Sequence, residues 1–134
     1  MPRLYREAPL NSIWEGSGNV ICLDVLRALG KEANAVDAML AELRAARGAD
    51  PRFDAHCDQT EALLARAEES QARRITEALA LALQGALLVR HAPAWVADAF
   101  CASRLANEWG HTLGTLPTAT DIPALVKRAQ PTGA

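Results

Sequence analysis

The sequence predicts an all-α protein, a bundle of about five helices. Of its 134 residues, 28 are Ala and 18 are Leu, whereas only 6 are Val, 4 are Ile and 6 are aromatic. Ala and Leu favour helices, and strands prefer the β-branched and aromatic residues that are scarce in this chain. Apolar side chains also recur at i, i+3, i+4 and i+7, the spacing of one helix face. The length suits a single domain.

A loop is predicted over residues 1–18, because two prolines and two glycines lie there without an apolar period. A helical bundle domain follows over residues 19–110. The tail over residues 111–134 is rich in Gly, Pro and Thr, so we expect it to be mobile, with at most a short helix near 122–129.

Local signals mark where the first three helices of the bundle begin and end. The first is predicted from Asn19, with apolar side chains at 22, 25, 26 and 29, and Gly30 ends it. The second ends at Gly48. Asp50 and Pro51 supply an N-cap and a first-turn proline for the third helix. Whether that helix continues beyond its apolar stripe is not decided by the pattern.

A long helix is predicted over about residues 70–90, apolar nearly all round in its middle and therefore central in the bundle. Pro93 ends it, and a fifth helix is predicted over 94–109. Trp95 and Trp109 fall on one stripe of that helix with small Ala residues, which predicts a role in the core or in a subunit contact.

The charge and cysteine content exclude several classes of protein. The chain has 14 Lys and Arg against 16 Asp and Glu, a formal net charge of −2, which gives no general argument for nucleic acid or an anionic membrane as partner. Three widely spaced cysteines favour buried thiols over a disulfide framework. The N-terminus is charged where a signal peptide is apolar, and no apolar run reaches the ~20 residues of a membrane span. We expect a cytoplasmic protein.

The segment over residues 11–20, NSIWEGSGNV, carries the strongest chemical signal. Two glycines stand beside a carboxylate and a large aromatic directly before a predicted helix. Glycine lets a backbone approach a ligand closely, and a helix N-terminus offers unpaired N–H groups, so such a loop can hold a flat or anionic cofactor edge. If Glu15 is buried against Ile13 and Trp14, its pKa rises and it becomes a better proton acceptor.

The alternative interpretation of this segment is an ordinary turn. In that case Ser17 or Asn19 caps the following helix, and Glu15 balances the positive end of the helix dipole. On the residues alone the ordinary turn is the favoured interpretation, because carboxylates with a perturbed pKa are a minority.

The run Ile13-Trp14-Glu15-Gly16-Ser17 resembles the Ile-Tyr-Glu-Gly-Thr segment of acyl-CoA dehydrogenases. The longer string over residues 1–29 is similar to the AidB-like branch of that family, flavoproteins of the adaptive response to DNA alkylation. The resemblance covers nearly the whole chain but only the C-terminal part of the family's chain. It implies a helical bundle like the C-terminal domain of acyl-CoA dehydrogenases. The family's N-terminal helical domain, β-domain and first bundle helices have no counterpart in this sequence.

The resemblance also implies roles for individual residues. It makes Glu15 the catalytic base that removes the α-proton of an acyl-CoA thioester while a hydride passes to the flavin. Trp14 borders the substrate cavity, and Gly16 and Ser17 contact the FAD; Ser17 replaces the commoner Thr and keeps its hydroxyl. The isolated chain is expected to be inactive and not to retain FAD, because the domains that hold flavin and thioester together are missing.

Arginines provide further candidates, each with a plainer alternative. Arg27 is a candidate anion contact, or else pairs with Asp24 at i, i+3 on a solvated face. The arginines at 66, 73, 74 and 90 form either an edge for duplex DNA or a solvated helix face, since glutamates are interleaved with them. The three histidines are far apart in the sequence, so no metal site is predicted.

Two functions of other classes compete with the flavoprotein interpretation. One is a DNA-binding module of an alkylation-response protein without dehydrogenase activity, which would bind with steep salt dependence. The other is an oligomerisation module, because a bundle that lacks partner helices exposes apolar faces that favour a homo-oligomer.

Overall fold

The computed structural model describes residues 2–14, 16–109 and 112–131. Within these ranges every regular element is helical, which confirms the predicted all-α class. The elements in order are α1 (Pro2–Glu7), the 3-10 turn η1 (Ala8–Ser12), α2 (Gly18–Lys31), α3 (Ala33–Ala46), α4 (Pro51–Leu64), the 3-10 turn η2 (Glu69–Gln71), α5 (Ala72–His91), α6 (Ala94–Phe100), the π-helical turn η3 (Cys101–Leu105) and α7 (Ile122–Ala129).

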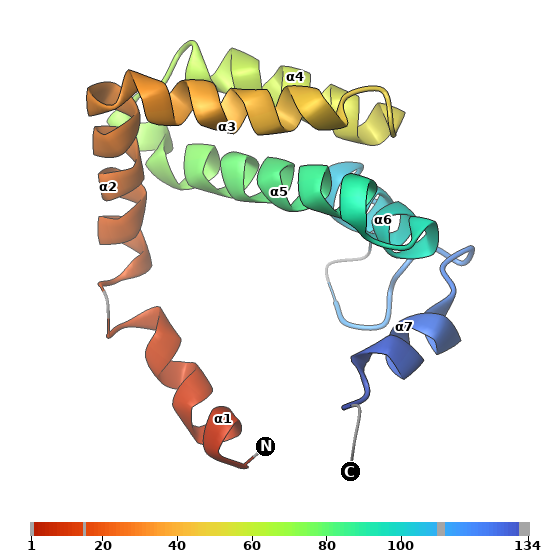
Figure 1. Ribbon diagram of the computed structural model, residues 1–134. Helices are drawn as coiled ribbons and strands as arrows, with labels where there is room; N and C mark the ends of the chain where they lie inside the picture. The colour runs from red at the N-terminus through yellow and green to blue at the C-terminus, as the bar shows by residue number, and fades with distance from the viewer. Residues whose placement is uncertain (1, 15, 110–111, 132–134) are drawn as a thin grey trace.

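Helix α5 is the centre of the bundle, as its all-round apolar sequence predicted. It contacts α2, α3, α4, α6 and η3. Figure 1 shows α3 and α4 lying side by side along α5, with α2 crossing near the start of α5 and α6 near its far end. The five helices α2–α6 are those expected from the sequence, and the short helices α1 and α7 raise the number in the described ranges to seven.

The core lies where α3, α4, α5 and η3 meet. Its fully buried side chains include Leu43, Phe53, Cys57 and Cys101, and α5 contributes the small residues Ala82 and Ala86. At Gly85 the helices approach so closely that a Cβ atom would lie 3.0 Å from Phe53 Cδ2 and 3.1 Å from Leu105 Cδ1. A core built from so much Ala and Gly therefore depends on short distances between helix axes rather than on many large side chains.

Helix α4 begins as the sequence predicted. The Asp50 side chain accepts a hydrogen bond from Arg52 N at 2.8 Å, and Pro51 occupies the first turn, where its missing N–H costs no helical bond. The open question about its end is settled at Leu64, beyond which a turn and η2 separate α4 from α5.

Three predicted boundaries are wrong. Gly30 does not end the first helix of the bundle, because it has no positive φ and α2 continues to Lys31. The predicted loop over residues 1–18 contains α1 and η1, because Pro2 and Pro9 lie in first turns, where proline is tolerated, and Arg3 Nε pairs with Glu7 Oε1 at 2.9 Å one turn on. The predicted helix over 94–109 ends after η3. Asn107 has φ +58°, a left-handed conformation that ends a helix.

The N-terminal arm, residues 2–14, lies outside the bundle. Its side chains are exposed throughout, and α1 packs on η1. Figure 1 shows the arm extending from the start of α2, and α7 lying apart from the bundle on the side of α6. Across the described ranges, no helix has both the length and the apolar character that crossing a bilayer requires.

Candidate functional site

The candidate site is the turn that joins the N-terminal arm to α2. Ser17 is the N-cap residue of α2, with φ −67° and ψ 152°, but its hydroxyl makes no hydrogen bond to the first turn. The first helical bond runs from Ile21 N to Ser17 O at 3.1 Å. Among the described residues, no side chain therefore caps the N–H groups at the start of α2, and the alternative in which Ser17 caps the helix is not observed.

Gly16 gives this turn its shape. Its φ is +116°, a backbone conformation that residues with a Cβ rarely adopt. A Cβ there would nevertheless have room, because the nearest atoms are 3.9 Å away on Val20 and Ile21. The requirement for glycine is therefore conformational. Glu15, the candidate base next to it, lies outside the described residues.

The aromatic residue of the motif lies on the surface of the arm. Trp14 is 68% exposed and Ile13 is 65% exposed. Trp14 lies at the edge of an open groove of about 300 Å³ that it shares with Glu7, Leu10 and Asn11. This groove is not an enclosed cavity, so the substrate-bordering role of Trp14 stays a prediction.

A residue at the start of the central helix α5 contacts the first turn of α2. Arg73 Nε donates a hydrogen bond to Asn19 Oδ1 at 2.7 Å. Both side chains line a groove of about 450 Å³ together with Leu23, Glu69, Ser70 and Ala72. Asn19 is thus bonded to another helix instead of capping its own. The sequence predicted for Arg73 only a DNA edge or a solvated face, because no local pattern links residues 54 positions apart.

Arg27 does not join the other candidate residues. It forms the ion pair with Asp24 that the i, i+3 spacing predicted, with side chains 64% and 59% exposed. Ten residues of helix separate it from Ser17, which corresponds to about 15 Å along the axis. Its role as an anion contact stays a prediction.

The arginines considered for a DNA edge are only partly available. Arg90 Nη1 pairs with Glu42 at 2.7 Å, and Arg73 is bonded to Asn19, which leaves Arg66 and Arg74 exposed. Two of the four guanidinium groups are therefore engaged within the molecule.

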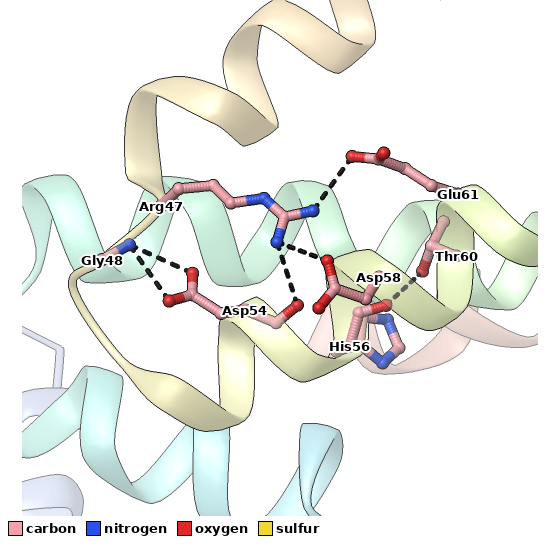
Figure 2. A network of polar contacts seen from close by, with 7 residues as sticks. All are labelled: Arg47, Gly48, Asp54, His56, Asp58, Thr60 and Glu61. Atoms are coloured by element: carbon pink, nitrogen blue, oxygen red, sulfur yellow. Dashed lines mark hydrogen bonds and ion pairs between the residues drawn. The ribbon is translucent and has the colours of Figure 1, made fainter.

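The strongest polar network lies elsewhere, at the α3–α4 turn, and it is structural (Figure 2). Arg47 donates to Asp58 Oδ1 at 2.6 Å and to Glu61 Oε1 at 3.0 Å, while Gly48 N donates to both carboxylate oxygens of Asp54. These bonds tie the turn to one face of α4 and leave the carboxylates occupied.

The buried thiols also have a structural role. Burial raises the pKa of Cys57 and of Cys101 to about 11, so both are protonated near neutral pH and poor nucleophiles. This agrees with the packing role predicted for them. Among the described residues, no three His, Cys, Asp or Glu side chains lie close enough to hold a metal ion.

The fold and the turn together define a class of protein: an all-helical segment in which a Trp-Glu-Gly-Ser sequence leads into a helix that Ser17 does not cap. The sequence of this turn is the one that resembles acyl-CoA dehydrogenases. No protein-family model matches the chain. Over 110 residues, or 82% of its length, the chain is 41% identical to "Putative acyl-CoA dehydrogenase AidB" of Escherichia coli (strain K12). The chain is therefore homologous to a segment of an acyl-CoA dehydrogenase-like protein, and the predicted AidB-like resemblance is confirmed. The chain spans 20% of the length of this relative.

Proposed function

We propose that this chain is the C-terminal part of an FAD-dependent, acyl-CoA dehydrogenase-like flavoprotein, in which Glu15 takes the α-proton of an acyl-CoA thioester. The observation that supports this most is the Trp-Glu-Gly-Ser sequence directly before the uncapped start of α2, within a chain homologous to AidB. An uncapped helix start favours an anionic or strongly polar ligand edge.

The residues around the turn fit one edge of a flavin nucleotide. Gly16 has no side chain to obstruct a ligand, and the Ser17 hydroxyl is exposed and makes no cap bond. The grooves of the described residues are open and measure about 250–450 Å³. Ligand sites that bury most of a drug-sized molecule span about 300–1,000 Å³ and are concave. The remaining walls of an FAD site would come from other polypeptide.

Each motif residue has a distinct part in the proposed reaction. FAD, when bound, supplies the two-electron oxidation of the thioester by accepting a hydride. The Glu15 carboxylate accepts the proton released as the α-C–H bond breaks, and Trp14 borders the acyl chain. Gly16 contacts the flavin nucleotide through its backbone, and Ser17 contacts it through its backbone and hydroxyl group. The proposed substrate class is acyl-CoA thioesters.

The test uses a chimera in which this chain replaces the matching segment of E. coli AidB. We expect the chimera to bind flavin, seen in its visible absorption spectrum, and to exchange the α-protons of a bound acyl-CoA with D₂O. Glu15→Gln should retain the flavin and slow this exchange by about 10²–10⁴-fold, the usual contribution of a general base. Glu32→Gln, an exposed carboxylate that caps no helix through its side chain, is the matched control and should not change the exchange rate.

Exchange that continues in the Glu15→Gln chimera would remove Glu15 from the mechanism. A folded chimera with no flavin band would contradict the FAD assignment.

One observation favours a second candidate function, self-association. In the N-terminal arm, Leu4 is 64% exposed, Tyr5 83% and Leu10 51%. Exposed apolar side chains that lie together mark interaction sites. A homo-oligomer predicts a concentration-dependent sedimentation coefficient that Tyr5→Ser reduces. No observation favours duplex DNA to the same degree, because the net charge is −2 and two of the four candidate arginines are engaged.

A further inference from the structure

We propose that Arg73 is a positioning residue, which fixes the start of α2 and with it Gly16 and Ser17 directly before this helix. Its Nε–H donates to Asn19 Oδ1 at 2.7 Å, across 54 residues of sequence. The significance of this contact for chemistry rests on the proposed function, whereas the contact itself and its effect on the turn do not.

The Arg73–Asn19 bond is the main directional contact between α2 and the rest of the bundle. Within the described part of residues 2–31, the other side-chain hydrogen bonds are local: Arg3 with Glu7, Ser12 with Pro9 O, and Arg27 with Asp24. Helix α2 otherwise contacts α3 and α5 by packing. Apolar packing is non-directional, so a hydrogen bond in the first turn specifies how α2 is rotated about its axis.

Arg73 is well placed to act as a fixed reference point. It is the second residue of α5, the central helix, and its neighbours Ala72 and Ile75 are 5% and 0% exposed. A Cβ built on Gly18 would lie 4.0 Å from Arg73 Nη2, so the guanidinium also lies over the first residue of α2. Gly18 is two residues from Gly16, and a displacement at Arg73 would therefore reach the turn directly.

Helix stability alone does not explain an arginine at this position. Arg73 is in the first turn of α5 and beside the first turn of α2, and a cation is unfavourable at the positive end of either helix dipole. The hydrogen bond to Asn19 and the position over Gly18 account for it.

The experiment measures amide hydrogen exchange by NMR in the full 134-residue chain. Arg73→Gln and Asn19→Ala should each raise the exchange rates of the Ile21, Cys22 and Leu23 amides about fivefold, the size expected for one modest hydrogen bond. The double variant should show no further increase, because both substitutions break the same contact. Arg74→Gln is the matched control: its side chain is exposed on the same turn of α5, and it should leave all these rates unchanged.

Two further measurements separate positioning from a general effect on stability. The Gly16 amide and Trp14 indole resonances should shift in Arg73→Gln and not in Arg74→Gln, while the amides of Thr60 and Ile75 in the core keep their exchange rates. Asn19→Asp keeps an acceptor oxygen for Arg73. It should therefore slow the exchange of the α2 amides more in the chain with Arg73 than in the Arg73→Gln variant. Arg73→Lys provides a milder variant should Arg73→Gln fold poorly.

Unchanged exchange at Ile21–Leu23, an equal rise in the core amides, or additive effects in the double variant would each overturn the proposal. The outcome is independent of the flavin. If Arg73 and Asn19 are coupled but the AidB chimera binds no flavin, only the proposed function is contradicted. If the chimera binds flavin but the two residues are not coupled, only the positioning role of Arg73 is contradicted.

Discussion

The bundle core and the N-terminal arm are built from residues of the same kinds but use them differently. In the core, Phe53 is fully buried and Gly85 allows α5 to approach it closely. In the arm, Trp14 is 68% exposed. Gly16, directly after the arm, has a positive φ, and an added Cβ there would have no atom closer than 3.9 Å. An aromatic and a glycine serve packing in one region and serve a turn in the other. The arm therefore contributes little to folding of the bundle, which is consistent with a role in contacting something outside it.

Truncating the aromatic residue in each region should give the largest contrast. Phe53→Ala is expected to lower the free energy of unfolding by about 3–5 kcal/mol, because it leaves a cavity between α4 and α5. Trp14→Ala should change the free energy of unfolding by no more than about 0.5 kcal/mol, because this side chain is exposed and lies outside the core. Urea unfolding monitored by circular dichroism measures both.

A large loss of stability in Trp14→Ala would show that the arm is part of the folding unit. Phe53→Leu keeps the core partly filled and serves where Phe53→Ala does not fold.

A second contrast uses two helical glycines. Gly85→Ala should destabilise by about 1–2 kcal/mol, because the added Cβ would lie 3.0 Å from the ring of the fully buried Phe53, and overpacking outweighs the gain in helix propensity. At Gly30 in α2 nothing lies within 4 Å of an added Cβ. Gly30→Ala should therefore stabilise by up to about 1 kcal/mol through propensity. Thermal unfolding of the two variants side by side tests the signs; two changes of the same sign would contradict this account of the core.

The same contrast explains how much of the molecule the sequence alone could predict. Features that depend on composition or on residues a few positions apart were predicted correctly. They are the all-α class, the start of α4 at Asp50-Pro51, the end of α5 before Pro93 and the Asp24–Arg27 pair. The helices at Pro2–Glu7 and Ala8–Ser12 were missed because a proline marks a first turn as readily as a loop.

Long-range contacts were less accessible to prediction. The bond between Arg73 and Asn19 could not be predicted, because it depends on how α2 crosses α5 and leaves no local pattern. The helix ends after η3 because Asn107 has a left-handed backbone conformation. The apolar stripe through Trp109 predicted a longer helix and gave no sign of this turn. For the candidate site, the motif identified the family resemblance, while the roles of Glu15, Trp14, Gly16 and Ser17 stay predictions.

The smallest expected effect concerns pH and compares two aspartates. Hydrogen bonds from the Arg52 guanidinium lower the pKa of Asp50, whose side chain is 14% exposed, below its ordinary value of 3.8. A lowered folded-state pKa means that the stabilisation is complete above the unfolded value and is lost as the pH falls through the folded one. Asn is as good an N-cap as Asp, so Asp50→Asn removes the charge and keeps the cap. We expect a cost of about 1 kcal/mol at pH 7 that shrinks as the pH falls through the folded-state pKa.

Asp24→Asn is the matched control in the other region. Asp24 is 59% exposed and pairs with Arg27 within α2, a contact worth about 0.2–0.5 kcal/mol. Urea unfolding at pH 7 and pH 2 should therefore separate the two variants at the higher pH. If Asp50→Asn costs as little as Asp24→Asn at pH 7, the Asp50–Arg52 contact does not stabilise the start of α4, and the capping oxygen alone accounts for the helix beginning there.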